Sequence, residues 1–103
     1  MSFKQSAILS AAAAGATINT NESGLCPGMK IVAEIGSPGA AFVGSAIVQT
    51  SEDGSTWGTA TGAVAVTGPG LNIQEITLKQ YLRLNVTAYT SGNIQASFFG
   101  ELI

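Results

Sequence analysis

Residues 47–57 predict a β-hairpin and read Ile47-Val48-Gln49-Thr50-Ser51-Glu52-Asp53-Gly54-Ser55-Thr56-Trp57. Asp53-Gly54 lies between two extended segments, and Gly supplies the positive φ that the favoured hairpin turns need. Ser51 and Ser55 add side-chain oxygens that can bond nearby backbone groups. Trp57 has a large apolar surface, which is expected to pack against the core beside the turn.

Short apolar or β-branched segments recur along the chain, separated by clusters of Gly, Pro, Ser and Asn. This pattern predicts further strands, over residues 30–35, 42–50, 59–67, 71–78, 81–89 and 94–98. In the third of these, Val64 and Val66 are expected on one face. In the fourth, the change of parity between Ile73 and Ile76 indicates a bulge.

The clearest alternation lies in residues 81–89. One predicted face holds Leu82, Leu84, Val86 and Ala88, and the other holds Arg83, Asn85 and Thr87. A period of two residues puts one face of a strand in the core and leaves the other wet or at an interface. A turn at residues 90–93 is expected to make a second hairpin with the closing strand, in which Phe98 points inward and Phe99 outward.

Residues 1–29 are predicted to be an Ala-rich N-terminal arm or the first strands, and residues 30–103 the β-sandwich body. Extended pieces are expected over residues 4–10 and 16–19, with a short helix at the Ala11–Ala14 run as the alternative. An arm that docks on a neighbouring subunit is a further alternative. The whole chain is predicted to be one all-β domain, a small antiparallel β-sandwich or jelly-roll-like barrel of short strands.

The composition favours association with other subunits. Charged residues make up 10% of the 103 residues and hydrophobic residues 46%, whereas an average soluble domain has about 25% charged residues. So few charges cannot cover the surface, and the weak net repulsion favours contact between molecules. The alternative is a neutral monomer whose surface is rich in Ser and Thr.

The sequence lacks residues that several classes of function require. The net charge is −2, and the four basic residues are scattered (Lys4, Lys30, Lys79 and Arg83), so no basic patch for nucleic acid or a membrane surface is expected. With no His and a single cysteine, Cys26, neither a Cys/His pair nor a zinc site is expected. No signal peptide is recognised at the start, and the chain is expected to be unprocessed and intracellular at synthesis. We therefore expect no metal, no cofactor and no enzymatic activity.

Three features have a functional and a structural interpretation. Glu52 and Asp53 could be a carboxylate pair, but Asp preference in turns explains them better. Arg83 is either a solvated strand residue or an interfacial salt-bridge partner. The aromatic residues could form a sugar-stacking platform, although core packing and interface contacts are favoured. Phe99 and Arg83 are thus the candidate interface residues, and Asp53, Gly54 and Trp57 form the structural hairpin.

The motif of residues 49–57 and the later Tyr81-Leu82-Arg83-Leu84-Asn85-Val86-Thr87-Ala88 strand resemble small virion proteins of tailed bacteriophages. These are β-sandwich or jelly-roll decoration (cement) proteins and related minor head proteins. The resemblance covers residues 30–103. The Asp-Gly-x-Thr-Trp turn also occurs in discoidin-like binding modules, and it is one residue shorter than the Asp-box turn of sialidase propellers.

The resemblance implies a non-enzymatic protein on the exterior of a phage capsid, made in the host cytoplasm. It implies a homo-oligomer, with a homotrimer favoured, that contacts the major capsid protein. A carbohydrate-binding β-sandwich module of a tail fibre or enzyme is the alternative, and another small head or tail subunit is a third.

Overall fold

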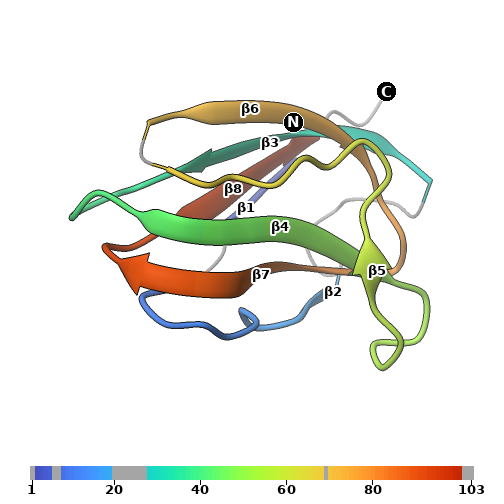
Figure 1. Ribbon diagram of the computed structural model, residues 1–103. Coiled ribbons are helices and arrows are strands. Elements are labelled where there is room, and N and C mark those ends of the chain that lie inside the picture. Colours follow the sequence, from blue (N-terminus) through green and yellow to red (C-terminus); the bar gives the residue numbers. More distant parts are fainter. Residues whose placement is uncertain (1, 6–7, 20–27, 69, 101–103) are drawn as a thin grey trace.

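The computed structural model describes residues 2–5, 8–19, 28–68 and 70–100, which contain strands and no helix. The strands are β1 (Ser2–Gln5), β2 (Ile18–Asn19), β3 (Lys30–Gly36), β4 (Val43–Ser51), β5 (Gly58–Thr59), β6 (Asn72–Thr77), β7 (Tyr81–Ser91) and β8 (Gln95–Gly100). They form two antiparallel sheets with the orders β1-β8-β3-β6 and β2-β7-β4-β5, seen as two layers in Figure 1. The all-β sandwich predicted from the sequence is confirmed.

The strand order is that of a jelly roll. β1 pairs with β8, β2 with β7, β3 with β6 and β4 with β5. Two further pairs, β3 with β8 and β4 with β7, complete the sheets. The chain therefore folds as one long antiparallel hairpin that is wound around a core, the eight-stranded arrangement of jelly rolls.

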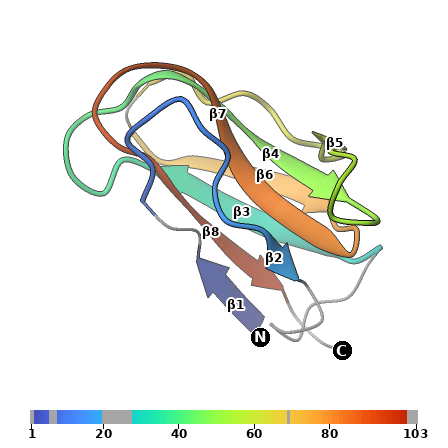
Figure 2. The ribbon, with the colours of Figure 1, turned by 90° about the horizontal axis from the view of Figure 1, so that it is seen from below.

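Residues 8–19 close one side of the sandwich. Leu9 bridges to Ile94 in one sheet, and Ala14 bridges to Asn85 in the other, ahead of β2. Figure 2 shows this segment passing from β1 beside β8 to β2 beside β7. The segment is extended or bent, so the short helix considered for its alanine run does not form.

The opposite side is closed by residues 60–66. Thr77 donates its backbone N–H to the carbonyl of Thr61, 3.0 Å away, which links this segment to β6. The Gln74 side chain bonds both backbone groups of Val64, as a neighbouring strand would. Its Oε1 accepts from Val64 N (3.1 Å) and its Nε2 donates to Val64 O (2.6 Å). Gln74 is buried, and these bonds satisfy its amide.

The return strand of the central hairpin is shorter than predicted. β5 spans two residues only, paired with Gln49 and Thr50. The chain then leaves the strand conformation, so that Val64 is 62% exposed while Val66 is buried. The expectation that these two valines share one face is wrong, because the segment turns to close the side of the sandwich.

The bulge predicted between Ile73 and Ile76 is also absent. β6 pairs with β3 in one uninterrupted register from Lys30↔Thr77 to Ile35↔Asn72. Ile73 simply points outward, 62% exposed, while Gln74 and Ile76 point inward. The register shifts of the described strands lie instead between β4 and β7, at Val43/Gly44 and Ser45/Ala46.

The last two strands do not form a hairpin. β7 pairs with β2 and β4, whereas β8 pairs with β1 and β3 in the other sheet. The corner between them is held to an earlier loop, where Asn93 donates its N–H to the carbonyl of Ala40 at 3.1 Å. The connection therefore crosses from one layer to the other.

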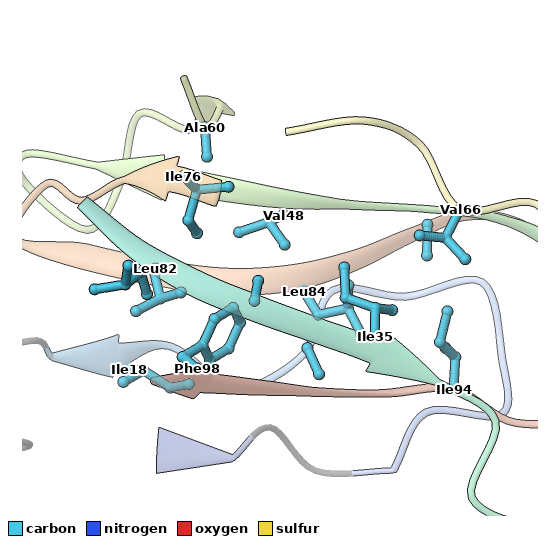
Figure 3. Packing of buried hydrophobic residues seen from close by; sticks show 14 of the residues in the cluster. Ile18, Ile35, Val48, Ala60, Val66, Ile76, Leu82, Leu84, Ile94 and Phe98 are labelled. Carbon is cyan, nitrogen blue, oxygen red and sulfur yellow. The ribbon is translucent and has the colours of Figure 1, made fainter. Parts of the chain in front are cut away.

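The core lies between the two layers. In Figure 3, Ile35, Ile94 and Phe98 of one sheet face Val48, Leu82 and Leu84 of the other. The buried apolar cluster consists of Ile18, Ile31, Ala33, Ile35, Phe42, Ala46, Val48, Ala60, Val66, Ile76, Leu78, Leu82, Leu84, Val86, Ile94, Ala96 and Phe98. Phe98 is inward as predicted. Cys26 lies outside the described residues.

Candidate interaction surfaces

The loop of residues 52–57 is built around two side chains. Asp53 Oδ1 accepts hydrogen bonds from the backbone N–H groups of Ser55 and Thr56, both at 2.8 Å. Ser51 Oγ donates to the same carboxylate oxygen (3.0 Å) and accepts from Gly54 N (2.9 Å). Gly54 has a φ of 79°, the conformation for which a glycine was predicted. The Asp53 carboxylate thus braces the loop.

These hydrogen bonds favour the charged form of Asp53. The N–H groups of Thr56 and Ser55, followed by the Ser51 hydroxyl, lower the pKa of Asp53 from 3.8 to about 2. A carboxylate held by backbone N–H donors is a poor proton donor near neutral pH. This supports the structural interpretation of Asp53 over a catalytic one.

The bracing of the loop should be lost only in strong acid. Because the folded-state pKa of Asp53 is lowered, its contribution to stability is present above pH 3.8 and disappears as the pH falls toward about 2. We expect the carboxyl ¹³C signal of Asp53 to titrate with a midpoint near 2. Ser51→Ala should move that midpoint upward, since it removes one donor. A wild-type midpoint at the ordinary value of 3.8 would contradict the bonding described.

Trp57 lies on the outer face of the β2-β7-β4-β5 sheet and not in the core. The Arg83 guanidinium carbon is 4.1 Å from the centroid of the Trp57 ring. Arg83 Nε also donates to Gln49 Oε1 at 2.8 Å, from the position directly across the β4–β7 ladder. The expectation that Trp57 packs against the core is wrong, because the loop turns the indole toward Arg83, where it stacks as a cation–π pair.

Arg83 is therefore not a plainly solvated strand residue, and its role as an interfacial salt-bridge partner stays a prediction. Within the described residues it has no carboxylate partner, and Trp57 and Gln49 fix its side chain. An arginine held in this way loses little conformational entropy when it binds a partner. The structural hairpin residue Trp57 and the candidate interface residue Arg83 are thus parts of one surface.

The pairing of Arg83 with Trp57 can be measured as a coupling. A double-mutant cycle with Arg83→Met and Trp57→Leu should give a coupling free energy of about 0.5–1 kcal/mol in urea unfolding. Trp57 is the only tryptophan, so Arg83→Met should also make the protein's tryptophan emission more accessible to acrylamide. Additive single losses together with unchanged quenching would show that the two side chains act independently.

The aromatic side chains do not form a sugar-stacking row in the described part of the chain. Phe42 and Phe98 are buried, and Arg83 covers one face of Trp57. Tyr89 is exposed, but its hydroxyl donates to the Gly92 carbonyl at 2.8 Å and its ring lies beside Phe42. The aromatic residues are distributed between the core, one sheet face and a corner.

Phe99 lies on the opposite side of the molecule from Arg83. It belongs to β8 and pairs with Val32 of β3 on the outer face of the β1-β8-β3-β6 sheet. It is half-buried there, whereas Val32 is 39% exposed and Ile73 62% exposed. The structure therefore assigns the two candidate interface residues to two different surfaces.

A shallow hollow of about 320 Å³ lies at the edge of this second face. Glu34, Gln95 and Ser97 supply its polar wall, and Pro38 and Leu71 supply apolar surface. Within the described ranges, no group of three or more Cys, Asp or Glu side chains is placed to hold a metal ion. The hollow can offer one carboxylate and neighbouring hydrogen-bonding groups to a small polar ligand.

Three exposed or half-buried positions on this face were missed from the sequence: Lys30, Val32 and Glu34. They alternate with Ile31, Ala33 and Ile35, which are buried. The alternation was visible, but it does not tell which of two alternating sets faces a partner. Nor does it reveal that Phe99 and Ile73 join the same surface from other strands.

Among residues 2–5, 8–19, 28–68 and 70–100, no helix has the length and hydrophobicity that crossing a bilayer requires. No protein-family model matches the sequence, and neither a curated protein nor a solved structure matches the chain. A proposal of function therefore depends on the surfaces described above and on the resemblance of the two motifs.

Proposed function

We propose that this chain is a non-enzymatic structural protein of a phage virion that binds the capsid exterior and stabilises it as a homo-oligomer. The observation that carries the proposal is an apolar outer sheet face on a chain with few charges. Val32 and Ile73 are exposed there next to half-buried Phe99, and only 10% of the residues are charged. Exposed apolar surface of this kind is a mark of protein contacts.

The jelly roll is compatible with this role without demonstrating it. The fold occurs in capsid domains and also in lectins, so it permits both candidate functions and decides between neither. The choice in favour of a virion role comes from the two motifs that resemble decoration proteins. The location of this chain on the capsid exterior and its contact with the major capsid protein are part of the same proposal, and the resemblance favours a trimer.

Stabilisation of a shell requires two kinds of contact. A decoration protein that spans adjacent capsomers raises the free energy needed to separate them, and many copies act together. The Trp57–Arg83 surface is our candidate for contact with the shell, because Trp and Arg are enriched among residues that dominate binding energies. The outer face with Phe99 then remains for contact between copies.

The proposal is tested by adding purified protein to expanded capsids of the phage that encodes it. We expect co-sedimentation with the capsids and a higher temperature of capsid disruption. Arg83→Met should weaken binding, while the exposed-loop variant Glu52→Gln should bind as the wild type. Protein that leaves the capsids in the supernatant at micromolar concentrations would refute the capsid role.

A carbohydrate-binding module is the second candidate, and the hollow beside Glu34 is the observation that favours it. Polar groups of Gln95 and Ser97 next to the apolar side chain of Leu71 suit one sugar ring. A glycan panel screened by NMR should then shift the amide signals of these residues. Unchanged spectra at millimolar glycan would exclude this candidate.

A further inference from the structure

We propose that the outer face of the β1-β8-β3-β6 sheet binds the same face of a second copy of this chain, with the two β3 strands antiparallel and Val32 at the centre. This inference rests on the proposed homo-oligomeric state and assigns it a pairwise contact in place of the trimer that the resemblance favours. The contact is isologous, so it joins copies in pairs about a two-fold axis.

The charges along β3 are self-complementary. Lys30, Val32 and Glu34 occupy alternate positions, and the residues between them are buried, so all three lie on the outer face. The proposed two-fold axis lies in the plane of the interface, runs perpendicular to β3 and passes through the position of Val32. It reverses the strand direction in the second copy. Lys30 of each copy then faces Glu34 of the other, which gives two ion pairs.

Within a single copy these charges cannot neutralise each other. Four residues along a strand separate Lys30 from Glu34 by about 13 Å. Directly across the ladders, Lys30 is paired with Thr77, and Glu34 is paired with Ile73 and Ser97. Neither charged side chain has an ion-pair partner within the described residues. A second copy supplies the missing partner at both ends.

The centre of the proposed contact is apolar. Val32 is in register with Phe99 of β8, so both lie on the proposed axis and meet their counterparts in the second copy. Ile73 of β6 extends the apolar surface next to Glu34. Charged positions at the ends of an apolar centre match the usual anatomy of interfaces, in which polar rims surround an apolar core.

A contact of ordinary size would take only a modest share of the exposed surface. A standard interface covers about 800 Å² per partner, and the chain exposes 5096 Å² in all. Two sheets that pack face to face lie about 10 Å apart with their strands within about 30° of each other. The side chains of Phe99, Val32 and Ile73 can fill such a gap.

One residue on the face opposes the contact. Glu75 of β6 is in register with Val32, so its two copies approach each other near the axis. Glu75 is exposed on an outer strand, which leaves its carboxylate room to turn toward solvent, but the like charges still weaken the pair. Glu75→Gln should therefore strengthen self-association.

The test is a charge exchange followed by analytical ultracentrifugation of the full chain. Lys30→Glu and Glu34→Lys should each weaken dimerisation by about tenfold or more, because each brings like charges together twice. The double variant Lys30→Glu/Glu34→Lys should restore dimerisation to within about threefold of the wild type. Glu52→Lys, in the exposed hairpin loop, makes the same charge change as Glu34→Lys and should leave dimerisation unchanged.

Circular dichroism and the urea midpoint of each variant separate lost association from lost folding. A double variant as weak as the single ones, or single variants as strong as the wild type, would overturn the assigned face. So would a wild type that is monomeric at all concentrations. A trimer that binds capsids and ignores the charge exchange would reject this contact while the capsid role stands. A dimer that responds as predicted but binds no capsid would support this contact and reject the capsid role.

Discussion

Replacing Gly92 by alanine is expected to destabilise the protein by about 3 kcal/mol or more, a large part of the total for a domain of this size. Gly92 has a φ of 82° at the corner between β7 and β8. A Cβ there would overlap the Ala41 carbonyl and come within 2.7 Å of Phe42 Cα. Backbone on the other side of the corner cannot rotate away as a side chain would. The measurement is urea unfolding followed by circular dichroism.

Gly28→Ala is the matched control for this variant. Gly28 has nearly the same φ, 83°, but a Cβ added there meets nothing within 4 Å. Only the intrinsic cost of the left-handed conformation remains, about 1–2 kcal/mol. The difference between the two variants therefore isolates the collision with residues 41 and 42. Equal losses would mean that the corner is not packed as described.

Phe98→Ala should cost about 3–5 kcal/mol, the usual range for removing a fully buried aromatic ring. Phe98 is 0% exposed and is among the largest side chains of the core. It projects from β8 toward the facing sheet (Figure 3), so its removal opens a cavity between the two layers. The same urea experiment gives the value, read as a fall in the midpoint with an unchanged slope.

Its neighbour Phe99 provides the control. Phe99 points to the outer face and is half-buried, so Phe99→Ala should cost no more than about 2 kcal/mol in unfolding. The comparison is made at low protein concentration, where self-association contributes little. If both substitutions cost the same, the assignment of the two rings to opposite faces of β8 would be wrong.

The predictable part of the fold came from local patterns. The alternation in residues 81–89 placed Leu82, Leu84 and Val86 in the core, where they are buried. Ala88, predicted on the same face, is exposed instead. Asp53-Gly54 marked the hairpin between β4 and β5, which are the only described strands adjacent in sequence that pair with each other. Such signals are reliable because strand alternation and positive φ depend on a few neighbouring residues.

These local patterns did not predict which distant strands pair with each other. The turn near Gly92 looked like the end of a hairpin, yet it connects the two sheets. A short turn and two alternating strands are equally compatible with both arrangements, and the corner is decided by contacts with residues 40–42, which are remote in sequence. Contacts that are remote in sequence also decide the burial of Ile73 and Gln74. The apolar character of Ile73 predicts burial, yet Ile73 is exposed. Gln74 is buried instead, because its amide bonds Val64 across the side of the sandwich.

The candidate surfaces were likewise predictable only in part. Asp53 and Gly54 were predicted as turn residues, and the hydrogen bonds of the loop give them that role. Trp57 was expected in the core, but it stacks on Arg83 because the loop of residues 52–57 is longer than a tight turn and carries the ring to the outer face. Phe99 was expected to point outward and does so, but its strand β8 belongs to the sheet that does not contain Arg83.

By itself, the sequence determined that this chain is an all-β domain of short strands with few charges, because residue type and spacing set extended structure and burial locally. The tertiary structure alone decided that β3 pairs with β6 and β8, and so brought Lys30, Val32 and Glu34 onto one face with Ile73 and Phe99. Surfaces of this kind join residues far apart in the chain. Their composition depends on which edges and faces satisfy their hydrogen bonds and bury their apolar side chains together.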